Sequence, residues 1–86
     1  MPEVILWTTA FCELCDEAKE HLQYACERLN TSYTCLDIVE YDEVFDALRH
    51  RIPVVEVAGH QLGWPFSKYQ LVAWLTEVLT SRTDMV

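Results

Sequence analysis

Glycine, proline and basic residues are scarce in this chain, and each scarcity excludes a class of protein. Two Gly and three Pro, beside a hydrophobic fraction of 51%, exclude a collagen-like or broadly disordered chain. Six Lys and Arg stand against 14 Asp and Glu, so the net charge is −8. The few basic residues are scattered along the sequence. We therefore expect neither nucleic acid nor a membrane surface as a partner.

Long hydrophobic runs are also lacking. The apolar run within the N-terminal MPEVILWTTAF is too short to span a bilayer or to serve as a secretory core, and an acid stands where a signal peptide needs a basic region. We therefore expect a cytoplasmic protein. A chain of 86 residues supports one domain, 1–86, with a single modest core, and we expect residues 81–86 to form a flexible tail.

Hydrophobic periodicity predicts an alternating α/β chain. Residues 4–8 (VILWT) are continuously apolar, which is typical of a central strand covered on both faces. Apolar residues in 13–29 recur at three- and four-residue spacing, as in a helix with one buried face, and Asn30 is a suitable stop. Ser67 and Gln70 form a capping-box pattern. The predicted order is βαβαββα, with strands over 4–8, 33–38, 54–57 and 61–64, helices over 13–29, 42–49 and 67–79, and a tight turn at 58–60.

Cys12 and Cys15 form a Cys-x-x-Cys pair just after the first predicted strand, at the start of the first predicted helix. The unpaired amides and the dipole of a helix N-terminus stabilise a thiolate, which is the form that attacks disulfides. On one helical turn the second sulfur can also reach the first. The position therefore predicts dithiol exchange, with Cys12 as the nucleophile and Cys15 as the resolving thiol.

Two other interpretations of the pair stand beside exchange. It would be half of a zinc site if further ligands lay at a suitable spacing, but the remaining cysteines and histidines show no such spacing, and we expect no metal ligand set. The thiols would otherwise be inert core residues. We expect that core role for Cys26, on the apolar face of the first helix, and for Cys35, within the second strand.

The element order, the Cys12-Glu13-Leu14-Cys15 motif and Ile52-Pro53 at the third strand together resemble the thioredoxin fold in its small glutaredoxin form. The run Leu62-Gly63-Trp64-Pro65-Phe66 is similar to that of small glutaredoxin-like bacterial proteins. The resemblance implies a three-layer α/β sandwich around a mixed four-stranded sheet. It also implies a cis Ile52–Pro53 bond facing the cysteines, with the backbone of Ile52 bonded to a bound peptide or glutathione.

The chain departs from the typical glutaredoxin at several site positions. Glu13 and Leu14 replace Pro-Tyr between the cysteines, and no basic residue precedes the motif. Gly63 matches the first of two paired glycines, whereas Trp64 stands at the second and Ser67 stands at the aspartate that binds the amino group of glutathione. Ile52 and Pro53 are expected to bind substrate by resemblance, and Glu13 because it lies inside the motif. The full set of expected substrate-binding residues is Phe11, Glu13, Leu14, Ile52, Pro53, Trp64 and Ser67.

The expected function is that of a thiol–disulfide oxidoreductase acting on a disulfide-containing protein, a peptide or glutathione. No cofactor is expected, although glutathione is a candidate co-substrate. One alternative is a non-catalytic binding module that keeps the fold. Another is a metal ion or iron–sulfur cluster bound through Cys12. The acids around Cys12 are either a filter for partners or a solvated helix face.

Overall fold

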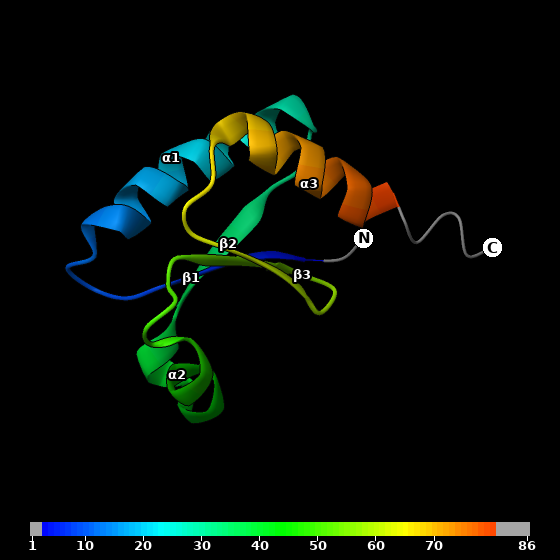
Figure 1. Ribbon diagram of the computed structural model, residues 1–86. Helices are drawn as coiled ribbons and strands as arrows, with labels where there is room; N and C mark the ends of the chain where they lie inside the picture. Colours follow the sequence, from blue (N-terminus) through cyan, green and yellow to red (C-terminus); the bar gives the residue numbers. More distant parts are fainter. Residues whose placement is uncertain (1–2, 81–86) are drawn as a thin grey trace.

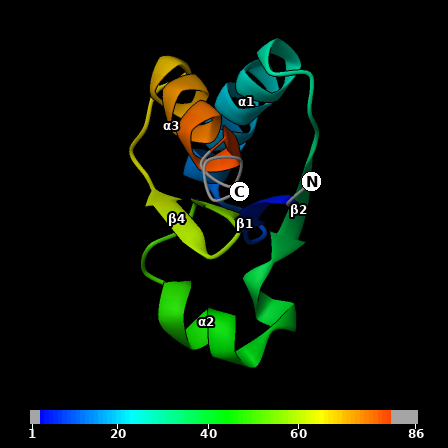
Figure 2. The same ribbon diagram turned by 90° about the vertical axis from the view of Figure 1, so that its right-hand side faces the viewer.

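A computed structural model describes residues 3–80 and has a four-stranded sheet between helical layers (Figures 1 and 2). The sheet order is β2-β1-β3-β4, with β1 parallel to β2 and antiparallel to β3. Helices α1 and α3 cover one face, and α2 covers the other. The elements are β1 (Val4–Thr8), α1 (Glu13–Arg28), β2 (Tyr33–Asp37), the 3-10 helix η1 (Ile38–Glu40), α2 (Asp42–Leu48), β3 (Val54–Val57), β4 (His60–Gly63) and α3 (Lys68–Thr80).

This architecture confirms the predicted order and the three-layer sandwich. The expected tail at 81–86 lies outside the described residues. None of the helices formed by residues 3–80 has the length and hydropathy needed to cross a bilayer.

Strand β1 is the centre of the core because its side chains alternate between the two covered faces. Val4 and Leu6 join the cluster under α1 and α3, whereas Trp7 joins the cluster under α2. All three are buried, with exposed fractions of 6% or less. The continuous apolar run predicted a strand covered on both faces, and the structure confirms that prediction.

Helix α1 ends at Arg28, one residue before the predicted end, and Asn30 is the stop that the sequence indicates. Asn30 has a φ of 55°, in the left-handed region that Asn tolerates better than most residues. The Thr31 amide donates to the Cys26 carbonyl (2.9 Å) and the Asn30 amide to the Glu27 carbonyl (3.3 Å). These two bonds form a Schellman motif, which satisfies carbonyls at the end of the helix.

The boundaries of the other elements differ slightly from the prediction. Val57 pairs with His60, so the hairpin has a two-residue loop, and His60 belongs to the strand rather than to the turn. Ala58 and Gly59 both have positive φ, 51° and 85°, as this tight loop requires. Strand β2 stops at Asp37, whose Oδ1 accepts from the Val39 amide (2.9 Å) and caps the 3-10 turn.

The prediction that Cys35 is buried was wrong. Its register partner is Leu6 on β1, but Cys35 itself is exposed. β2 is an edge strand, so the side of Cys35 away from β1 has no neighbouring strand. Cys26 is buried on α1, as predicted.

Candidate active site

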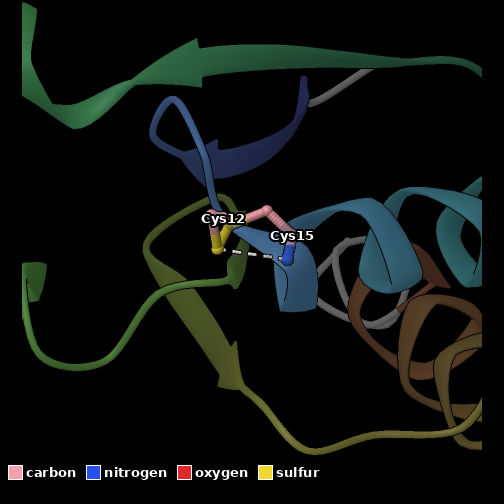
Figure 3. Close-up of a disulfide and its surroundings, with 2 residues drawn as sticks. All are labelled: Cys12 and Cys15. Carbon is pink, nitrogen blue, oxygen red and sulfur yellow. Dashed lines mark hydrogen bonds between the residues drawn. A yellow bond between two sulfur atoms is a disulfide. The ribbon is translucent and has the colours of Figure 1, made fainter.

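Cys12 is the N-cap residue of α1, and Cys15 lies within the first turn (Figure 3). A disulfide joins the two residues, whose Cα atoms are 5.2 Å apart. The Cys15 amide also donates to Cys12 Sγ at 3.2 Å. Cys15 is buried, with 3% of its surface exposed, whereas Cys12 is half-buried. The pair is therefore asymmetric, with Cys12 the more accessible sulfur.

The end of β1 and the start of α1 place Cys12 at the helix terminus. β1 stops at Thr8, and Phe11, with a φ of 59°, makes the turn that leads into the helix. Unpaired amides of the first helical turn and the helix dipole favour negative charge at Cys12. Glu13 and Asp16 lie in the same turn and oppose that charge. The sequence-based placement of Cys12 is confirmed.

The loop before β3 lies at the same end of the sheet. β3 is antiparallel to β1, so it begins where β1 ends. The Ile52–Pro53 bond is cis, as the resemblance implied, and Trp64–Pro65 is a second cis bond that the sequence analysis did not predict. The Ile52 amide donates to the Leu48 carbonyl (3.1 Å). A substrate contact to the backbone of Ile52 would therefore use its carbonyl oxygen.

Trp64 follows β4 and is hydrogen-bonded to the loop that carries Pro53. Its amide donates to the Pro53 carbonyl (3.1 Å), and its ring is half-buried. The ring stacks on His21 of α1, with centroids 6.0 Å apart and planes at 11°. It also contacts Phe66 edge to face at 5.1 Å. The sequence analysis missed His21, because no spacing in the sequence indicates that this turn of α1 meets the segment after β4.

The side chain of Ser67 caps helix α3. Its Oγ accepts from the Gln70 amide (3.0 Å), which confirms the predicted cap of α3. The adjacent Lys68 ammonium lies over the Tyr24 ring at 4.6 Å and the Tyr69 ring at 5.3 Å. Where a glutaredoxin has an aspartate for the amino group of glutathione, this chain thus has a hydroxyl already bonded to its own backbone.

Apolar side chains beside the disulfide are open to solvent. Phe11 is fully exposed, at 105% of its reference surface, and Leu14 is 46% exposed. Tyr41, which follows β2 and which the sequence analysis did not single out, is also exposed, at 40%, and contacts buried Trp7 of β1 edge-on at 5.3 Å. In residues 3–80, no group of three or more His, Cys, Asp or Glu side chains is arranged to hold a metal ion.

Comparison with known proteins agrees with this architecture. The chain is similar to target protein XcR50 of X. campestris, whose crystal structure has 31% sequence identity and a TM-score of 0.75 over 85% of this chain and 95% of that one. The solution structure of XcR50 matches with 31% identity and a TM-score of 0.73, over 86% of this chain and 92% of that one.

No curated protein matches the chain significantly. Residues 3–76 match the family described as Glutaredoxin-like domain (DUF836). The match covers more than half of the chain and agrees with the fold and with the cysteine pair. The chain therefore belongs to the glutaredoxin-like domain family (DUF836).

Proposed function

We propose that the protein is a cytoplasmic thiol–disulfide oxidoreductase that uses Cys12 and Cys15 as a dithiol pair. The observation that supports this most is the Cys12–Cys15 disulfide at the N-terminus of α1, with one sulfur accessible and the other buried. The Cys15 amide that donates to Cys12 Sγ would also stabilise a Cys12 thiolate in the reduced protein. Cytoplasmic thiol systems would return the pair to the dithiol form.

The exchange proceeds in two substitutions at sulfur. The Cys12 thiolate attacks a substrate disulfide, forms a mixed disulfide, and releases the other substrate sulfur as a thiol after proton uptake. Cys15, having lost its proton to solvent, then attacks Cys12 Sγ and releases the second substrate thiol. Two electrons pass to the substrate, and a reducing dithiol or two monothiols reverse the steps on the protein. Glutathione is one candidate for such a monothiol.

A redox titration in defined thiol buffers tests this proposal, with free thiols counted by mass after alkylation. Cys12 and Cys15 should interconvert as one two-electron couple, with a potential between about −180 and −300 mV. Cys12→Ser should abolish the couple, while Cys15→Ser should accumulate mixed disulfides on Cys12. If no Cys12–Cys15 disulfide forms at any potential, dithiol exchange is wrong, and the protein would instead be a binding module that keeps the fold.

A further inference from the structure

Phe11 is an exposed aromatic side chain next to the accessible sulfur. At 105% of its reference surface, it touches almost nothing in residues 3–80, and its φ of 59° is rare for a bulky residue. Leu14, between the two cysteines, is 46% exposed. Large apolar groups of this kind at a functional site usually pack against a partner.

A second exposed segment lies at the same end of the sheet. β1 and β2 are parallel, with Thr8 paired to Asp37, so both strands finish at the same end of the sheet. After β2, Val39 and Tyr41 are 60% and 40% exposed. Two segments with exposed apolar side chains therefore follow adjacent strands, and one of them carries the redox pair.

Acidic residues are interspersed with these apolar side chains in both segments. Glu13 and Asp16 are exposed beside the disulfide, and Glu40 and Asp42 are exposed on either side of Tyr41. A partner that packs on the apolar groups therefore meets negative charge at close range.

Two cations also lie at this end, in the loop before Pro53. Arg51 is exposed, and Arg49 lies over the Phe45 ring at 5.8 Å. These two arginines do not balance the four acids, so the surface formed by the two segments keeps a net negative charge. Glutathione fits this surface poorly, because it has no large apolar group for Phe11 and its two carboxylates outweigh its one ammonium group, which leaves a net negative charge towards the acids.

From these observations we propose that the substrate is a disulfide within a polypeptide whose reactive cysteine has apolar neighbours and a net positive charge nearby, with Phe11 and Leu14 as its apolar contacts. The inference rests on the proposed exchange activity and specifies its substrate class. Glu13 and Asp16 then act as a charge filter, one of the two interpretations that the sequence left open.

Peptide selectivity tests the inference on the full chain. Each of four octapeptides has one internal cysteine, joined to 2-mercaptoethanol as a mixed disulfide. The residues next to this cysteine are Leu or Ser, and the outer residues are Lys or Glu, which gives the four combinations. Reduction by the dithiol protein is followed by mass spectrometry, with glutathione disulfide and the small neutral 2-hydroxyethyl disulfide in parallel. The Leu/Lys peptide should react at least about tenfold faster than the Ser/Glu peptide and than glutathione disulfide.

Variants separate the apolar and the charge contributions. Phe11→Ala should lower the rate for the Leu/Lys peptide about five- to tenfold more than the rate for the Ser/Lys peptide. Glu13→Gln combined with Asp16→Asn should reduce the preference for Lys over Glu peptides, as should added salt. Tyr69→Ala is the matched control, because Tyr69 is 67% exposed and packs on Tyr24, nine residues beyond Cys15 along α1. It should leave all of these rates unchanged.

The outcomes distinguish the inference from the function on which it rests. Absence of exchange even with 2-hydroxyethyl disulfide overturns the proposed function and this inference with it. Exchange with that compound, but equal rates for the four peptides or an equal rate for glutathione disulfide, overturns the inference alone. A dimer in sedimentation that Phe11→Ala dissociates also overturns it, since a second copy would then cover these side chains.

Discussion

The four cysteines differ in chemistry because the fold gives each a different environment. Cys12 is half-buried at a helix N-terminus, and Cys15 is buried behind it. Burial raises the pKa of Cys26 from 9.0 to about 11. Cys35 is exposed, and it lines a hollow of about 360 Å³ together with Cys26. One residue type therefore occurs here in three states: a disulfide pair, a buried apolar side chain and an exposed thiol.

Alkylation of the oxidised, native protein should distinguish the two free thiols. Iodoacetamide at pH 8 should label Cys35 and leave Cys26 unlabelled over the same period. Cys26 is 3% exposed, and its pKa of about 11 keeps the thiol protonated at this pH. Peptide mapping by mass spectrometry identifies the site. Cys35→Ser should then take up no label until the protein is denatured. Rapid labelling of Cys26 in that variant would show that the α1 face opens.

At the scale of elements, both ends of α1 depend on individual residues rather than on helix propensity. Cys12 caps the start of the helix with its sulfur, and Asn30 ends it in a left-handed conformation. Helix ends leave several amides and carbonyls unpaired, so these residues determine where the helix begins and stops. The disulfide therefore includes the residue that caps the helix.

Substitution of Asn30 should test the C-terminal end. Asn30→Ala is expected to lower the free energy of unfolding by roughly 1 kcal/mol, because Ala tolerates the φ of 55° poorly. Asn30→Gly, the matched variant, should stay within a few tenths of a kcal/mol of the parent or be slightly more stable. Urea denaturation of the oxidised proteins measures both. Equal stabilities for the Ala and Gly variants would contradict the Schellman assignment.

At the scale of the whole molecule, the sheet separates two apolar clusters. The larger lies under α1 and α3 and includes Leu22, Leu71 and Leu75, while the smaller lies under α2 and includes Ile38 and Leu48. β1 contributes to both, so loss of either cluster would disturb the strand that leads to Cys12. Cys26 belongs to the larger cluster, which links its protonation to the stability of the whole domain.

Stability should therefore fall at alkaline pH. The pKa of Cys26 is higher in the folded protein, about 11, than its ordinary value of 9.0, so the folded state binds this proton more tightly. The stabilisation is fully present below about pH 9 and is lost as pH rises towards 11. Burial, followed by the charges of Cys35 and Cys26, also raises the pKa of Tyr33, which acts in the same direction.

Urea denaturation between pH 8 and 11 measures this dependence. Cys26→Ala should be less stable at pH 8, because it loses a buried side chain, yet its free energy of unfolding should fall less steeply above pH 9. Other groups that titrate in this range are common to both proteins, so the difference between the two curves reports Cys26 together with its charge interaction with Tyr33. Parallel curves would show that the Cys26 thiol ionises as readily in the folded protein as in the unfolded one.

Local patterns in the sequence determined most of the architecture. The apolar run 4–8 specified a central strand, and the spacing in 13–29 specified a helix with one buried face. Asn30 and Ser67 marked a helix stop and a helix cap, and Ala58-Gly59 marked a turn, because each acts on the backbone within a few residues of itself. The position of Cys12 at a helix start followed from the same patterns.

Only the tertiary structure decided how distant segments meet. Cys35 lies in a strand that local pattern assigns to the core, but the sheet order puts that strand at an edge and leaves the thiol exposed. The stacking of His21 on Trp64 and the contact of Tyr41 with Trp7 likewise join residues far apart in the chain. Burial and partner choice depend on which elements become neighbours, and no short stretch of sequence carries that information.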